Sequence, residues 1–141
     1  MKNDIHDLGL VLDSRVRLVI IESWQEPRVL ETIGSLAVQR AQTWYTWNHL
    51  DGLSRLGFGT DVDDEQGTRD PEAALETVRR AREDALYVFC DLHPFLDSPR
   101  IVRQLKSLAM STEVSAPTVI LVSHAVTLPQ ELTRLSARLQ L

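Results

Sequence analysis

Residues 86–91 read Leu-Tyr-Val-Phe-Cys-Asp, a run of apolar residues that ends on an aspartate. Such a run without alternation is typical of a strand that is buried on both faces of a parallel sheet. A helix start precedes it at Asp70-Pro71 and another follows at Ser98-Pro99, because each pair joins an N-cap residue to a proline suited to the first turn. A buried strand between two helices predicts an α/β protein.

The same alternation of strand and helix extends toward both ends of the chain. Further strands are expected at residues 16–21, 43–47, 119–122 and 137–141. Helices are expected around residues 4–13, from Pro27 through Ala37, from Pro71, from Pro99, and over residues 130–135. We therefore predict that residues 1–141 form a single domain, a three-layer α/β sandwich with a five-stranded, mostly parallel sheet.

Residues 49–70 interrupt this pattern and are rich in glycine and aspartate. The part from residue 51 to residue 70 holds six acidic residues and two arginines, whereas the whole chain has a net charge of −5. A long irregular stretch inside a compact domain is usually functional or disordered. The acids at 61–65 resemble a calcium loop only in their charge, because Gln66 stands where the turn requires glycine. We expect an acidic, solvated loop insertion here.

Composition excludes several classes of protein. A net charge of −5 argues against a general nucleic-acid binder, whose footprint is basic. Cys90 is the single cysteine, so a disulfide framework and multi-cysteine metal sites are excluded, and its apolar strand makes it a core residue. No apolar run is long enough for a membrane helix, and the first residues carry charges unlike those of a signal peptide. We expect a cytoplasmic protein without membrane contact.

Polar side chains follow the predicted strands. In open parallel sheets, ligands bind beyond the carboxyl ends of the strands. The residues expected there are Glu22, Ser23, Trp24, Asn48, His49, Asp91, His93, Ser123 and His124. A site at this edge is one interpretation, and strands that simply turn polar as they leave the core are the other.

Residues 86–91 resemble a Walker B element, in which an aspartate after an apolar strand holds magnesium. The residue that should be a water-activating glutamate is Leu92. The phosphate loop should read GxxxxGK[ST], but residues 22–27 contain no glycine and no lysine. They contain two glutamates, which would repel phosphate, and a proline, which has no N–H to donate. We therefore expect no NTP hydrolysis by this chain.

Two other catalytic interpretations stay open. A receiver-like signalling or small phosphoryl-transfer domain would use Asp91 as phosphoacceptor, with Glu22 and Ser123 after neighbouring strands. Such a domain also needs a second carboxylate after the first strand and a lysine after the last strand, and both are absent. A hydrolase or metal site would use His93 or His124, but the chain has no GxSxG or HExxH motif.

Four segments together resemble a known family. Residues 18–30, 70–75, 87–96 and 128–132 are similar to the N-terminal part of SpoVK-like AAA+ ATPases of bacteria, cyanobacteria and plastid genomes. The stretch Asp-Leu-His-Pro-Phe-Leu at 91–96, with its spacing to Ser98-Pro99, is the most specific piece. The resemblance extends from about residue 7 to Leu141.

The resemblance implies a degenerate P-loop NTPase-like fold of the AAA/RecA-like type, which keeps a Walker-B-like Asp91 and lacks the phosphate loop. It also implies that this region precedes an AAA+ module that uses ATP and magnesium and assembles into a ring. The chain would then be the N-terminal part of a longer ATPase, or a free-standing copy of that part. For this segment we expect no catalytic residue, no cofactor and no metal.

The resemblance further implies a domain that contacts a protein partner or the rest of an AAA+ ring, and an oligomer would fit this role. Three regions are candidate contact surfaces: the turn at residues 22–26, the acidic stretch at 51–70, and the corner at 93–95. The candidate interaction residues are Glu22, Trp24, Glu26, Asp91, His93, Phe95, Ser123 and His124.

Overall fold

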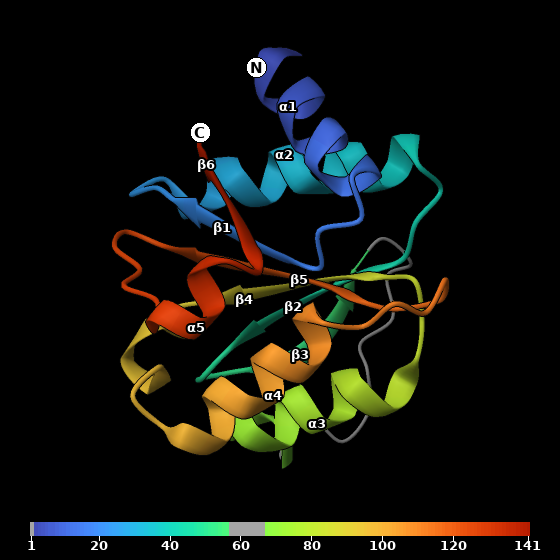
Figure 1. Cartoon of the computed structure of the whole chain (residues 1–141). Coiled ribbons are helices and arrows are strands. Elements are labelled where there is room, and N and C mark those ends of the chain that lie inside the picture. The colour runs from blue at the N-terminus through green and yellow to red at the C-terminus, as the bar shows by residue number, and fades with distance from the viewer. Residues whose placement is uncertain (1, 57–66) are drawn as a thin grey trace.

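A computed structural model describes residues 2–56 and 67–141. Its strands are β1 (Leu18–Glu22), β2 (Trp44–Asn48), β3 (Gly52–Leu56), β4 (Leu86–Cys90), β5 (Thr118–Ser123) and β6 (Ser136–Gln140). They form one sheet in the order β3-β2-β4-β5-β1-β6, shown in Figure 1. Every neighbouring pair is parallel except β2 and β3, so the sheet is mostly parallel as expected.

Helices cover both faces of this sheet (Figure 1). On one face lie α1 (Lys2–Asp13) and α2 (Glu26–Gln39), and on the other lie α3 (Pro71–Ala81), α4 (Pro99–Ala109) and the short α5 (Gln130–Thr133). Two single-turn 3₁₀ helices, η1 (Gly67–Arg69) and η2 (His93–Phe95), precede α3 and α4. The three-layer α/β sandwich predicted from the sequence is confirmed.

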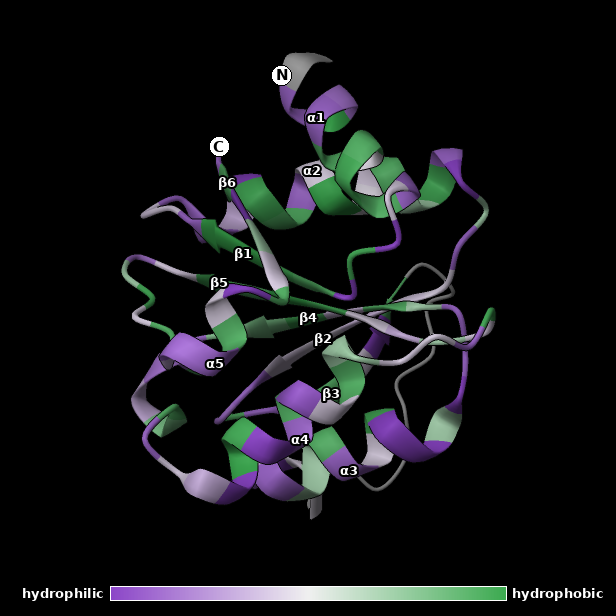
Figure 2. Ribbon diagram, in the orientation of Figure 1, coloured by the Kyte–Doolittle hydropathy of each residue, from purple (hydrophilic) through white to green (hydrophobic). Residues whose placement is uncertain are grey.

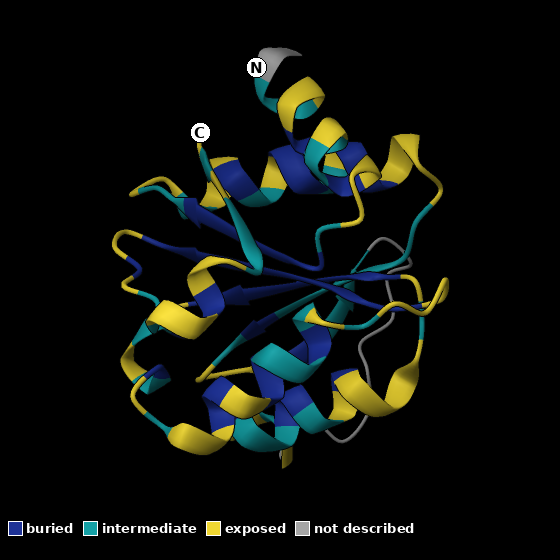
Figure 3. Ribbon diagram, in the orientation of Figure 1, coloured by how far each residue is buried: buried dark blue, intermediate teal, exposed yellow. Residues whose placement is uncertain are grey.

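The central strands are the most apolar part of the molecule (Figure 2). All five residues of β4 and all six of β5 are buried, and only Glu22 at the end of β1 is partly exposed (Figure 3). Burial on both faces explains why these strands show no alternation in the sequence. Side chains that point to one face join the core under α3 and α4, and those that point to the other pack under α1 and α2.

The sheet has six strands in the described residues, so the prediction of five is wrong. The additional strand is β3, which lies inside the stretch that was expected to be a loop insertion. The turn at Asn48 makes the pairing with β2 feasible, because its side-chain Oδ1 accepts hydrogen bonds from the backbone N–H groups of Leu50 and Asp51. Leu53 then buries its side chain in the core beneath β2. The acids at 61–65 lie outside the described residues.

The strand order brings β5 between β1 and β4, and β6 beside β1. Leu18 of β1 therefore pairs with Val119 on one side and with Ser136 on the other. This order is consistent with the P-loop NTPase-like topology that the family resemblance implied. It also brings the carboxyl ends of β1, β4 and β5 to one edge of the sheet. In the part of the chain that the structure describes, each helix is too short or too polar to span a bilayer.

Candidate interaction site at the carboxyl edge of the sheet

The turn that leaves β1 is short. Since β1 ends at Glu22 and α2 begins at Glu26, only Ser23, Trp24 and Gln25 connect them. The Ser23 hydroxyl accepts a hydrogen bond from the backbone N–H of Gln25 at 3.0 Å, and the N–H of Ser23 donates to the carbonyl of Ser123 at 2.9 Å. One hydrogen bond therefore stabilises the turn internally, and another holds it against the end of β5.

The Glu22 carboxylate is held by partners from distant parts of the chain. Its Oε2 accepts a hydrogen bond from the backbone N–H of Val126 at 2.8 Å, and its Oε1 lies 2.9 Å from Nη1 of Arg138 in β6. Arg138 also donates through Nη2 to the carbonyl of Val126 at 3.1 Å. The hydrogen bond from Val126 and the neighbouring guanidinium lower the pKa of Glu22. Glu22 is therefore an ionised structural link and not a free ligand.

Three side-chain rings lie in a row at this edge, those of Trp24, His124 and His93. Trp24 is 83% exposed, and its indole stacks on the imidazole of His124 with ring centroids 4.5 Å apart. The His124 ring meets His93 edge-on at 5.1 Å. His93 is hydrogen-bonded through Nδ1 to the buried Ser123 Oγ at 2.8 Å, and the same Nδ1 lies 3.8 Å from Asp91 Oδ1. We call Trp24, Asp91, His93 and His124 the carboxyl-edge corner.

Asp91 lies in the left-handed backbone region with φ of 60°, directly after β4. Residues other than glycine adopt this region at a cost, and such positions cluster at functional sites. The side chain of Asp91 is 62% exposed, so its carboxylate faces solvent beside His93. This edge of the sheet therefore presents two imidazoles, an indole and an accessible carboxylate.

The geometry of the corner does not form a hydrolase triad. In such a triad the serine and the aspartate bind opposite nitrogens of the histidine, whereas Ser123 and Asp91 both approach Nδ1 of His93. Within the described residues, no group of three or more His, Cys, Asp or Glu side chains is placed to hold a metal ion. The arrangement offers surfaces for stacking and hydrogen bonding.

Two other candidate residues, Phe95 and Glu26, have contacts of their own. Phe95 is partly buried and meets His49 edge-on at 5.1 Å, on the side of the sheet edge formed by β2. Glu26 lies near Cys90, a buried core residue as the sequence predicted. Burial, and then the nearby Glu26 carboxylate, raise the pKa of the Cys90 thiol to about 12, so it stays protonated.

The sequence did not predict the role of Arg138 in binding Glu22, because nothing in the sequence pairs the last strand with the first turn.

The described part of the acidic stretch has structural contacts. Asp51 accepts a hydrogen bond from the Asn48 amide at 3.1 Å, and Asp70 caps α3 by accepting from the N–H of Ala73 at 3.0 Å. The cap was predicted from the Asp70-Pro71 pair. These two acids therefore act within the domain.

Comparison with known protein families shows to which family the chain belongs. Residues 4–141 match the family described as "SpoVK-like AAA ATPase, N-terminal domain". The chain belongs to this family. The resemblance inferred from four segments of sequence is thus confirmed over almost the whole chain.

Curated relatives agree with this assignment. Three proteins titled "Uncharacterized AAA domain-containing protein ycf46" match, from Pyropia yezoensis, Guillardia theta and Trieres chinensis. Their identities are 28%, 26% and 27%, over 90%, 92% and 95% of this chain. The matched regions cover 26%, 25% and 27% of the relatives, so the chain spans about a quarter of their length.

AAA ATPases as full-length proteins use nucleotide and magnesium, and the residues at this edge do not fit them. A phosphate loop follows its strand with GxxxxGK[ST], whose backbone N–H groups surround the phosphates. Here three residues without glycine or lysine fill that position, with Glu22 and Glu26 on either side. The Glu22 charge is compensated by Arg138, and the turn offers neither a lysine nor a glycine-rich backbone to surround the phosphates of a nucleotide.

Proposed function

We propose that this chain is a non-catalytic, degenerate P-loop-like domain that mediates protein contact or assembly for an AAA ATPase. The carboxyl-edge corner is the proposed contact surface. One observation carries the proposal: at the position of a phosphate loop, a three-residue turn presents Trp24, which is 83% exposed. The family assignment to the N-terminal domain of AAA ATPases supports the same role.

An exposed tryptophan leaves a large apolar surface in water, and tryptophan is enriched among residues that dominate binding energy at protein interfaces. Stacking on His124 restrains the Trp24 ring in the free domain. A restrained side chain loses less conformational entropy on binding, which favours association.

The proposed partner is the rest of an AAA ring, either the AAA module of the same ATPase or a neighbouring copy. ATP and magnesium would then be bound by that module, and this domain would contribute contacts. Its net charge of −5 gives no reason to invoke nucleic acid as a partner.

Hydrogen exchange tests the contact surface. The experiment compares amide hydrogen exchange in the isolated chain with exchange in a full-length ATPase of the family that carries this domain. Protection should rise at the amides of Ser23, Trp24 and Gln25 in the full-length protein. Unchanged exchange at this turn would refute it as the contact surface.

A matched pair of variants sharpens this test. In the full-length ATPase, Trp24→Ala should weaken ring assembly by about tenfold or more, as expected for an interface hot spot. Val38→Ala on α2 removes an equally exposed apolar side chain, 78% exposed, and should leave assembly unchanged. Equal effects of the two variants would contradict the proposal.

The rival is a phosphoryl-transfer domain that uses Asp91, whose carboxylate is 62% exposed. Incubation with a small phosphodonor, followed by intact mass measurement of wild type and Asp91→Asn, separates the two. The proposal predicts no gain in mass, and a gain that requires Asp91 would favour the rival.

A further inference from the structure

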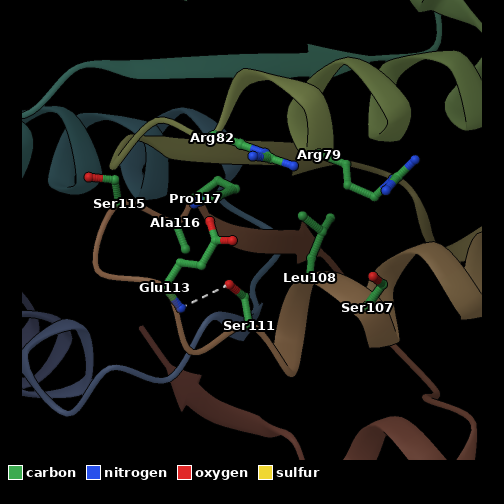
Figure 4. A pocket seen from close by; sticks show the side chains of 9 residues that line it. All are labelled: Arg79, Arg82, Ser107, Leu108, Ser111, Glu113, Ser115, Ala116 and Pro117. Atoms are coloured by element: carbon green, nitrogen blue, oxygen red, sulfur yellow. Dashed lines mark hydrogen bonds between the residues drawn. The ribbon is translucent and has the colours of Figure 1, made fainter.

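A second surface lies on the opposite side of the molecule from α1 and α2, where α3 and α4 pack against each other (Figure 1). A hollow of about 270 Å³ between them is lined by Glu76, Arg79, Arg100, Arg103, Gln104 and Ser107. A second hollow of about 150 Å³ shares Arg79 and Ser107 with the first and continues past Arg82 (Figure 4). We call the two together the α3–α4 groove.

The two helices differ in charge from the rest of the chain. Together α3 and α4 carry five cationic side chains and two carboxylates, a net charge of +3, whereas the whole chain has −5. Helix α4 supplies Arg100, Arg103 and Lys106 and has no acidic residue. The residues that line the groove include four arginines (Arg79, Arg82, Arg100 and Arg103) and two glutamates (Glu76 and Glu113), so its lining has a net charge of +2 on an acidic molecule.

Some of these cations are already paired. Arg79 and Arg80 share the carboxylate of Glu76, at 2.7 and 2.8 Å, and Arg100 lies 3.7 Å from Glu72. Arg103 is exposed and makes no ion pair with any residue that the structure describes. An exposed guanidinium beside a hollow is a ready partner for a carboxylate, which it can bind through two parallel hydrogen bonds.

Gln104 adds an observation that does not depend on charge. Its side chain is 9% exposed and donates through Nε2 to the carbonyl of Glu72 at 2.9 Å. Its Oε1 is buried, and among residues 2–56 and 67–141 it has no hydrogen-bond partner. A buried acceptor without a donor destabilises the unliganded domain. A ligand that donates an N–H to this oxygen therefore gains binding free energy.

We infer that the α3–α4 groove binds an acidic peptide segment of a partner protein. Its carboxylates would pair with Arg100 and Arg103, and a backbone N–H would reach Gln104 Oε1 once a lining side chain moves aside. An acidic peptide fits better than nucleic acid, because a peptide backbone carries N–H groups that can donate to Gln104 Oε1, whereas a sugar–phosphate backbone carries none. This surface is separate from the carboxyl-edge corner, so each can fail without the other.

Fluorescence anisotropy tests the inference with a short fluorescein-labelled peptide of alternating glutamate and alanine. The wild-type chain should bind it, with affinity that falls as salt is raised. The double variant Arg100→Glu with Arg103→Glu should weaken binding by about tenfold or more. Arg28→Glu reverses one charge on α2, on the other face of the sheet, and should change affinity by less than about twofold.

A third variant separates local recognition from overall charge. Gln104→Met keeps the net charge and nearly the volume, and it removes the unpaired Oε1 together with the Nε2 hydrogen bond to the Glu72 carbonyl. It should weaken peptide binding although the net charge is unchanged. Circular dichroism melts confirm that each variant is folded.

Absence of peptide binding by the folded wild type would overturn the inference, as would equal binding by the double variant. Tighter binding of a single-stranded oligonucleotide than of the peptide, lost in the same double variant, would also overturn it. Trp24→Ala should leave peptide binding unchanged.

Discussion

Glu22 illustrates how a carboxylate at a strand end becomes part of the structure. Its two oxygens are engaged by the Val126 N–H and the Arg138 guanidinium, which come from residues more than one hundred positions later in the chain. These contacts fasten the first turn to β6 and to the segment that follows β5. At the scale of one residue, the negative charge at the end of β1 is fixed by the fold.

A pH-dependent loss of stability should follow from Glu22→Gln. The folded-state pKa of Glu22 lies below its unfolded value, so its contribution is present above the unfolded pKa and is lost as pH falls through the folded pKa. At pH 7 the variant should lower the free energy of unfolding by about 1 kcal/mol, and the difference should shrink below about pH 4. Urea unfolding across this pH range measures it.

Glu31→Gln serves as the control for that experiment, since it removes an exposed carboxylate from α2. Its effect should stay within about 0.5 kcal/mol at each pH. A loss in Glu22→Gln that is no larger at pH 7 than at pH 3 would contradict the role assigned to the ion pair.

At the scale of elements, β3 is the feature that most needs a direct test. Leu53 is 3% exposed and packs into the core, and its backbone N–H donates to Thr68 Oγ1 at 3.0 Å. Leu53→Ala should lower the free energy of unfolding by about 2–4 kcal/mol. Leu50→Ala in the adjoining turn, where the side chain is 79% exposed, should change it by less than about 0.5 kcal/mol. Similar effects at the two positions in denaturant titrations would show that β3 does not pack as described.

The elements differ in how far the sequence predicts them. Strands β1, β4 and β5 follow from apolar runs, and α3 and α4 follow from an N-cap with proline, because these signals are local. Strand β3 has glycine, serine and arginine among its five residues, so its sequence carries little strand propensity. Its pairing depends on the Asn48 turn and on the core beneath β2, which are tertiary effects.

The residues of the candidate site also differ in how far the sequence predicts their positions and contacts. Trp24, Asp91, His93, Ser123 and His124 follow apolar runs, so their place at one edge could be predicted from the parallel sheet. The stacking of Trp24 on His124 and the pairing of Glu22 with Arg138 depend on the strand order, which the sequence leaves undetermined. Phe95, a candidate residue in the corner at 93–95, shares the turn η2 with His93 and contacts His49 edge-on, a contact that depends on the position of β2.

At the scale of the whole molecule, two surfaces of different chemistry lie on different parts of the sandwich. The carboxyl-edge corner presents rings and a carboxylate, whereas the α3–α4 groove presents arginines. A domain with both could hold one partner by an aromatic anchor and another by charge. Under the two proposals made above, the domain would act as an adaptor for an AAA ATPase.

Thermal unfolding of the chain with increasing Mg·ATP tests the central claim most directly. The claim is that the β1–α2 turn cannot hold a triphosphate. The account predicts that the melting temperature stays the same at every nucleotide concentration, within the error found with magnesium alone. A bound nucleotide at one hundred times its dissociation constant would add about 2.7 kcal/mol of stability. A rise in melting temperature that requires Mg·ATP would contradict the account, whether or not Asp91→Asn abolishes it.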